Sequence, residues 1–166
     1  LVNPVQMTWD PQGRLWVATS RHIGRLVDGR LELLPSEPGQ PLLQGGSLVF
    51  DRRGWLWIGR RAQGLALSRD PLSARPSFQH YTTADGLADN QCNSVIADQQ
   101  GNVWFTTAKG VSRLDLSSGR AGGRRFTSFN TADGLPNDTV QAALAAADGT
   151  MWFATVNGVS RWNGSR

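Results

Sequence analysis

Few side chains in this sequence of 166 residues belong to the types that perform catalysis, and their spacing does not group them. His22 and His80 are far apart in the sequence, and a lone surface histidine is the simpler interpretation of each. Cys92 has no histidine close in sequence to activate it, so we expect a small buried side chain rather than a reactive thiolate. Its neighbours do not show the spacing of metal ligands. We therefore predict no catalytic residue, no metal site and no cofactor.

A second group of side chains could bind a ligand by chemistry that needs no catalytic set. An indole or imidazole ring stacks on a sugar ring, and amide or guanidinium groups hydrogen-bond to hydroxyls. Residues that interrupt a repeat are the best candidates, because the fold does not require them there, and we expect them on loops. For each candidate, packing or hydration alone is the competing interpretation. The candidates are Trp9, Arg60, Arg61, His80, Gln91 and Asn93.

The elements that must position these residues are internal repeats. Four segments carry a glycine three residues before a tryptophan, and the tryptophans follow one another after 41, 47 and 48 residues. Two later copies are preceded by a shared turn, Ala-Asp-Gly-Leu, whose glycine lies 18 residues before its tryptophan, and Gly39 belongs to a degraded copy of that turn. The repeated glycines and tryptophans are Gly13, Trp16, Gly54, Trp57, Gly86, Gly101, Trp104, Gly134, Gly149 and Trp152.

Each tryptophan stands in an apolar triplet, such as Val103-Trp104-Phe105. Successive side chains of a strand point to opposite faces, so an apolar triplet indicates a strand covered on both faces. Glycine turns between the triplets, with Asn157-Gly158 the clearest two-residue hairpin signal, indicate antiparallel neighbours. Small sheets stacked face to face around an axis satisfy both conditions. A helical solenoid does not, because no segment shows a period of 3.6 residues.

The sequence thus predicts an all-β fold: a β-propeller of four-stranded antiparallel blades, with about four blades in an open or partial ring. It is one propeller segment over residues 1–166, with blade cores at about 1–35, 42–82, 91–130 and 138–166. We expect the innermost strands at 47–50, 94–97 and 140–144, and the outermost strands at the Phe78/Tyr81 and Phe126/Phe129 pairs. The recurring aspartates are expected to stabilise turns. They are Asp10, Asp51, Asp85, Asp98 and Asp133.

Composition limits the partners. The chain is 39% hydrophobic and 18% charged, which is typical of a globular protein. Its formal charge of +4 comes from scattered arginines, including a pair at Arg124/Arg125, so a solvated surface is the better interpretation than a nucleic-acid site. The sequence contains no apolar stretch approaching the ~20 residues of a membrane helix. We expect contact with a membrane only through parts of a longer protein.

The segments 84–113 and 132–161 closely resemble the two-component regulator propeller repeat, and the resemblance weakens before Phe78. It implies the periplasmic or extracytoplasmic sensor region of a bacterial transmembrane receptor. The output module of such a receptor is a histidine kinase, often in hybrid two-component systems, or a diguanylate cyclase. Several of these receptors respond to carbohydrate fragments, so a carbohydrate or another small molecule is the implied signal.

The family implies propellers of about seven blades. This sequence holds four repeat cores and no outer strand after Trp162, which suggests an excised piece that self-associates through exposed blade faces.

Two other functions remain open. A propeller can act as a rigid platform for another protein without a small ligand. A propeller enzyme is less favoured: residues 147–152 resemble the Asp-box of sialidases, but the other three copies place the aspartate differently. Streptogramin lyases also carry Gly-x-x-Trp repeats, yet they need a catalytic histidine and bound magnesium that nothing in this sequence identifies. We therefore expect no enzymatic activity in this segment.

Overall fold

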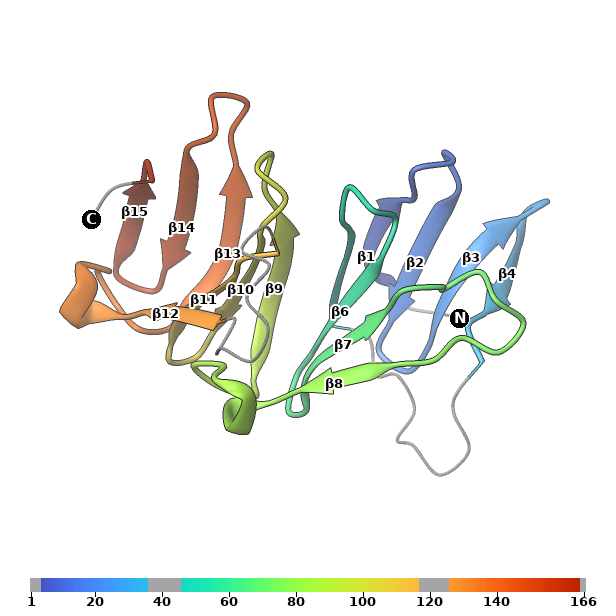
Figure 1. Ribbon diagram of the computed structural model, residues 1–166, viewed down its shortest axis with the longest axis horizontal. Coiled ribbons are helices and arrows are strands. Elements are labelled where there is room, and N and C mark those ends of the chain that lie inside the picture. Colours follow the sequence, from blue (N-terminus) through green and yellow to red (C-terminus); the bar gives the residue numbers. More distant parts are fainter. Residues whose placement is uncertain (1–3, 36–45, 117–125, 165–166) are drawn as a thin grey trace.

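The computed structural model describes residues 4–35, 46–116 and 126–164, and its strands form four antiparallel sheets, which we call blades 1 to 4 (Figure 1). Blade 1 holds β1 (Pro4–Trp9), β2 (Leu15–Thr19), β3 (Ile23–Val27) and β4 (Arg30–Leu33). Blade 2 holds β5 (Ser47–Phe50), β6 (Leu56–Arg60), β7 (Gly64–Ser68) and β8 (Gln79–Tyr81). Blade 3 holds β9 (Cys92–Ala97), β10 (Val103–Thr107), β11 (Gly110–Leu114) and β12 (Phe126–Phe129). Blade 4 holds β13 (Val140–Ala145), β14 (Met151–Thr155) and β15 (Gly158–Trp162).

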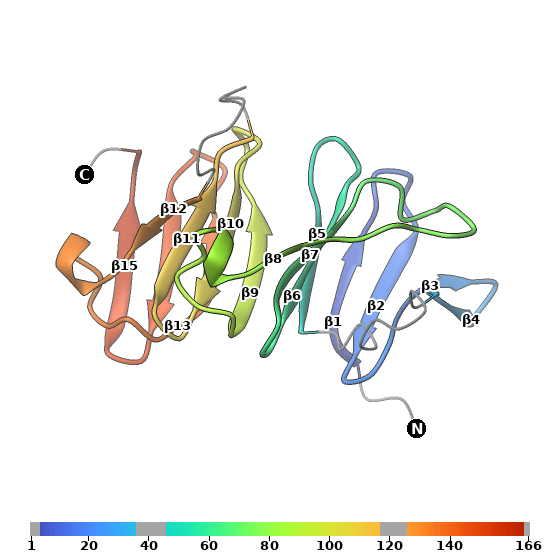
Figure 2. The same cartoon turned by 60° about the horizontal axis from the view of Figure 1, so that its bottom comes forward.

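The blades stand side by side, with blade 1 and blade 4 at the two ends of the row (Figures 1 and 2). Within each blade the strands follow one another in sequence order, and the first strands, β1, β5, β9 and β13, are neighbours from blade to blade. These are the predicted innermost strands, and β8 and β12 are the outermost strands of their blades. The predicted all-β propeller in a partial ring is confirmed. The predicted blade boundaries extend into residues 1–3, 42–45, 117–125 and 165–166, which lie outside the described residues, as do Gly39 and Arg124/Arg125.

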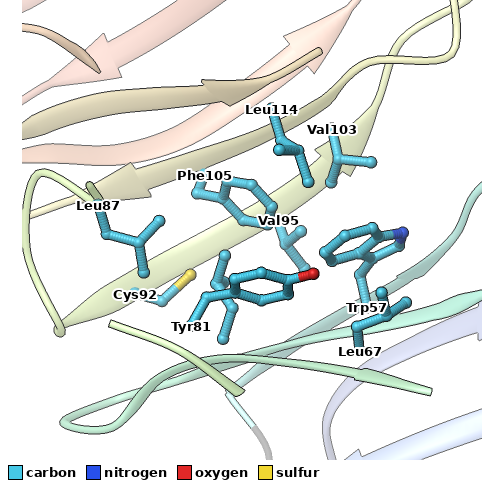
Figure 3. Packing of buried hydrophobic residues seen from close by; sticks show 10 residues of the cluster. Trp57, Leu67, Tyr81, Leu87, Cys92, Val95, Val103, Phe105 and Leu114 are labelled. Atoms are coloured by element: carbon cyan, nitrogen blue, oxygen red, sulfur yellow. The ribbon is translucent and has the colours of Figure 1, made fainter. Parts of the chain in front are cut away.

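The core lies between the blades rather than within them. Trp16, Trp57 and Trp104 are fully buried, and each belongs to an apolar cluster shared with the following blade. Between blades 2 and 3, Trp57 stacks on Tyr81 of its own blade at 6.1 Å and meets Phe105 of the next blade at 5.9 Å between ring centroids (Figure 3). Burying such large aromatic side chains is the main source of stability at these contacts.

The aspartates before the tryptophans hold both a turn and an indole. The carboxylate of Asp10 accepts hydrogen bonds from the backbone N–H groups of Gln12 and Arg14, which closes the β1–β2 turn. The same carboxylate accepts the indole N–H of Trp16 at 3.0 Å, and Asp51 and Asp98 bind their tryptophans in the same way. These aspartates thus stabilise turns, as predicted, and they also accept the hydrogen bond of a buried indole, which was not predicted.

Asp85 and Asp133 cap two short 3-10 helices, η1 (Thr83–Asp85) and η2 (Thr131–Asp133). Each carboxylate accepts the N–H of the residue that precedes its helix, Thr82 or Asn130. These helices connect the outer strand of one blade to the inner strand of the next. The predicted turn role therefore applies to them as well.

The last hairpin differs in register from the prediction. Thr155 pairs with Gly158 across β14 and β15, so the two linking residues are Val156 and Asn157, and Gly158 opens β15. The reason is a threonine turn: the Thr155 hydroxyl donates to the carbonyl of Gly158 and accepts the N–H of Asn157. The same bonds join Thr107 to Gly110 and Lys109 in blade 3.

Candidate functional site

A hollow of about 600 Å³ opens at the end of the blades where the inner strands β9 and β13 begin. Three of the six predicted ligand-binding residues, Arg61, Gln91 and Asn93, line it. The other lining residues are Gly46, Cys92, Thr139 and Gln141. The structure thus brings half of the predicted set into one polar site near the inner strands.

Two of the lining residues, Asn93 and Gln141, stand where the strand pairing is irregular. The pairing of β9 with β10 and of β13 with β14 shifts register at Asn93 and at Gln141, so each residue occupies a β-bulge. The side-chain amide nitrogen of Asn93 donates to the carbonyl of Val140 at 2.9 Å. This bond joins blade 3 to blade 4 and fixes the orientation of the Asn93 side-chain amide.

Gln91 and Arg61 lie on turns that border the hollow and are exposed. The backbone N–H of Gln91 donates to a carboxylate oxygen of Asp89 at 2.8 Å. That hydrogen bond, together with the ammonium of Lys109 at 3.3 Å, outweighs partial burial and holds the pKa of Asp89 below its ordinary value. Asp89 therefore remains charged at neutral pH and stabilises the turn that carries Gln91.

Cys92 is a buried residue of the lining. Its side chain is buried, and burial raises the pKa of its thiol to about 12. Gly59 makes room for the sulfur, because a Cβ on Gly59 would lie 2.5 Å from it. A thiol with so high a pKa is not a nucleophile at neutral pH, which agrees with the predicted packing role.

The other three candidates do not line the hollow. Trp9 ends β1 and is 64% exposed, Arg60 ends β6 and is buried, and His80 lies in the outer strand β8. Asn93 likewise lies in a strand, β9. The prediction that the candidates sit on loops is therefore wrong for these four, because a side chain that breaks the repeat can still occupy a strand position.

Arg60 replaces the threonine that begins the second hairpin of the other blades. Its guanidinium donates to the side-chain and backbone oxygens of Gln63 and, at 3.5 Å, to the carbonyl of Leu65. The hairpin of blade 2 is one residue longer than that of blade 3, so a longer donor spans it. Burial lowers the pKa of Arg60 without discharging it. These bonds give Arg60 a structural role.

Thr139 and Gln141 are site residues that the prediction missed. Both stand at repeat positions already singled out: Gln91 and Asn93 follow Gly86 by the same five and seven residues as Thr139 and Gln141 follow Gly134. Superposing the two repeats would have found them.

Chemically, the hollow offers one guanidinium, amides and a hydroxyl, which donate and accept hydrogen bonds but transfer no electrons or protons at neutral pH. Among the residues that the structure describes, no group of three or more histidine, cysteine, aspartate or glutamate side chains could hold a metal ion. His22, in the β2–β3 turn, and His80 do not border it.

The described part of the chain includes no helix of the length and apolarity that crossing a membrane demands.

Residues 134–157 match the family model of the two component regulator propeller, which confirms the resemblance at that repeat. A search of curated proteins returns no significant match. Among solved structures, the extracellular domain of BT4673 from B. thetaiotaomicron, assigned to a one component system, superposes with a TM-score of 0.80 at 20% identity. That alignment covers 98% of this chain and 23% of the other.

The extracellular domain of BT3049 from the same organism, assigned to a hybrid two component system, gives a TM-score of 0.75 at 20% identity, over 95% of this chain and 21% of that one. A streptogramin B lyase gives 0.66 at 18% identity, over 97% of this chain and 54% of the enzyme. The chain thus spans less than a quarter of the length of these two extracellular domains. Because extracellular domains of signalling systems and a lyase share this fold, the likeness establishes the fold alone.

Proposed function

We propose that this chain is part of the extracytoplasmic sensor propeller of a bacterial transmembrane signalling receptor. The observation that carries the proposal is the two component regulator propeller repeat at residues 134–157. The likeness in fold to extracellular domains assigned to signalling systems supports it. A histidine kinase or a diguanylate cyclase elsewhere in the protein would convert the signal.

The hollow is the proposed signal-binding site, and its chemistry favours a carbohydrate or a similar polyhydroxylated small molecule. Its polar groups are uncharged except for Arg61, so they suit hydroxyls and at most one acidic group on the ligand. Several of them come from different blades, since Arg61 follows β6, Asn93 lies in β9 and Gln141 in β13. A ligand bound there would bridge three blades and stabilise them against separation.

Thermal unfolding in the presence of neutral and acidic oligosaccharides tests this site. At least one sugar is expected to raise the melting temperature, and Arg61→Ala and Gln141→Ala are expected to reduce the shift by more than half. Gln99→Ala is the matched control, because Gln99 is exposed beyond the other end of β9. The site is refuted when no sugar shifts the transition, or when the shift survives in both site variants.

The receptor assignment has a separate test, the reading frame that encodes this chain. We expect a membrane-spanning helix followed by kinase or cyclase motifs. A frame that ends in a soluble propeller with neither motif would contradict the receptor while leaving the hollow as a binding site. A platform that binds another protein without a small ligand would then be the alternative, and a thermal screen in which no sugar shifts the transition would favour it.

A further inference from the structure

The hollow has open room at blade 2 and amide groups at blades 3 and 4. Gly46, Asn93 and Gln141 stand at the same place in their repeats, each seven residues after the glycine of the shared turn or of its degraded copy. All three residues line the hollow. Blade 2 therefore offers bare backbone at the position where the next two blades place a side-chain amide.

A side chain at Gly46 would require the backbone to move. A Cβ there would lie 2.7 Å from the carbonyl oxygen of Gly59, to which the N–H of Gly46 donates at 3.2 Å. The nearest side-chain atom to that Cβ is Cγ of Arg61, at 3.9 Å. The stem of Arg61 thus lies beside the bare backbone, and the room at Gly46 adjoins this arginine.

Arg61 brings to the hollow a positive charge that no acidic side chain neutralises. In the part of the chain that the structure describes, its guanidinium takes part in no ion pair and no hydrogen bond. The described lining includes no aspartate or glutamate. By contrast, Lys109 in the equivalent hairpin of blade 3 is paired with Asp89 at 3.3 Å. Arg61 is therefore available to an anionic group of a ligand.

The lining groups of blades 3 and 4 are neutral, and their hydrogen-bonding capacity is only partly used. One amide N–H of Asn93 donates to the carbonyl of Val140, which leaves the second N–H and the amide oxygen for a ligand. The Thr139 hydroxyl donates to the carbonyl of Ala108 at 3.5 Å and keeps its acceptor lone pairs. The Gln141 side chain is exposed. Amides and hydroxyls of this kind pair with the hydroxyls of a sugar.

We propose that the hollow selects sugar acids over neutral sugars, with the carboxylate of a uronic acid paired with Arg61 beside Gly46. The hydroxyls of the same sugar bind Asn93 and Gln141 on the two following blades. A guanidinium binds a carboxylate through two parallel hydrogen bonds, whereas a neutral sugar leaves it without a charged partner. This selectivity rests on the proposed sugar site and adds the class of sugar and its orientation. The three blades that supply these groups pack on one another, since β9 contacts both β5 and β13.

Protein-detected NMR titrations with matched pairs of sugars test the selectivity. Galacturonate and galactose differ only in carrying a carboxylate or a hydroxymethyl group on the ring, and glucuronate and glucose form a second such pair. At pH 7 and constant ionic strength, the acid of at least one pair is expected to bind the wild type about 10- to 100-fold more tightly than its neutral partner, as a hydrogen-bonded charged contact predicts.

Three single variants locate the source of the preference. Arg61→Ala is expected to abolish it while leaving the affinity for the neutral sugar unchanged. Gln141→Ala is expected to weaken the binding of acid and neutral sugar alike, so that their ratio stays the same. Arg21→Ala is the matched control, because Arg21 is an exposed arginine in the β2–β3 turn outside the lining, and it should alter neither affinity. All three side chains are exposed, so the variants should fold as the wild type does.

A preference for the acid that survives Arg61→Ala, or that Arg21→Ala also removes, overturns the assignment to Arg61. Equal affinities for acid and neutral sugar in the wild type overturn the selectivity but leave the carbohydrate site in place. Spectra that none of the four sugars changes also overturn the selectivity. The carbohydrate site itself fails only when, in addition, no oligosaccharide raises the melting temperature.

Discussion

Blades 3 and 4 carry nearly the same repeat, yet equivalent residues have opposite environments. Trp104 of blade 3 is 0% exposed and Trp152 of blade 4 is 39% exposed, while Val111 is 0% and Val159 63% exposed. The strands, the threonine turn and the arginine over the tryptophan ring are the same in both blades. The repeat therefore determines the shape of a blade, and the neighbouring blade determines how much that blade contributes to stability.

The largest expected effect is the difference between the two tryptophans. Trp104→Ala removes a buried ring from between two blades and should lower the free energy of unfolding by ~3–5 kcal/mol. Trp152→Ala removes a ring that is partly in solvent and should cost about 1 kcal/mol or less. Urea unfolding measures both. Equal losses would show that Trp152 is buried in the single chain, contrary to the structure.

A smaller difference is expected at the glycines that open the third strands. A Cβ on Gly110 would lie 2.1 Å from the Phe129 carbonyl of the outer strand, whereas the nearest atom to a Cβ on Gly158 is Pro136 Cβ at 3.8 Å. Both glycines have positive φ, so alanine costs backbone strain of about 1–3 kcal/mol at either site. Gly110→Ala should cost ~1–3 kcal/mol more because of the clash.

The same unfolding experiment compares Gly110→Ala with Gly158→Ala directly. Equal losses at the two glycines would mean that β12 moves aside without cost. In that case the outer strand, and not the glycine, would be the adaptable part of the blade.

The fold could be predicted because each blade carries the same sequence pattern. Apolar triplets and glycine turns recur at fixed offsets, so a strand that is ambiguous in one copy can be assigned from the others. The strands of Trp57 and Trp104, for example, both pair with the following strand in antiparallel fashion. Even so, the last hairpin was misplaced, since the hydrogen bonds of Thr155 decide its register.

The candidate site was harder to predict, because it depends on which blades meet. Arg61, Gln91 and Asn93 converge at the hollow only once β5, β9 and β13 lie side by side. Trp9 and Arg60 resemble ligand-binding residues in sequence, yet one lies on a blade face and the other replaces a turn threonine. Polarity and deviation from the repeat do not distinguish these environments.

Blade 3 and blade 4 also differ at the position of the repeat aspartate. Asp98 accepts the Trp104 indole N–H at 2.7 Å, but blade 4 has Ala146 at the equivalent position. Asp98→Ala leaves a buried indole N–H without its acceptor and should cost about 1–3 kcal/mol. Ala146→Asp supplies an acceptor to Trp152 and should stabilise by about 0.5–1.5 kcal/mol. Thermal unfolding of both variants measures this, and a destabilised Ala146→Asp protein would contradict the equivalence of the two turns.

The equivalent carboxylate of blade 1, Asp10, is expected to make stability depend on pH. Burial alone would raise the pKa of Asp10, but the backbone N–H of Arg14, the Trp16 indole and the Arg14 guanidinium together hold that pKa below its ordinary value of 3.8. A carboxylate whose folded pKa is depressed stabilises the fold fully at pH values well above 3.8, and that contribution is lost as the pH falls through 3.8 towards the folded pKa.

Asp10→Asn removes this titration while keeping a side chain of the same size. The variant should be less stable than the wild type at pH 7, by about 1–2 kcal/mol for a lost charged acceptor. The difference should shrink as the pH falls below 3.8, because the unfolded wild type takes up a proton there before the folded protein does. Asp70→Asn, at an exposed turn position, is the control and should show no such convergence. A gap between Asp10→Asn and wild type that stays constant from pH 7 to pH 3 would show that the Asp10 charge contributes nothing, and that the turn and the indole need only an oxygen.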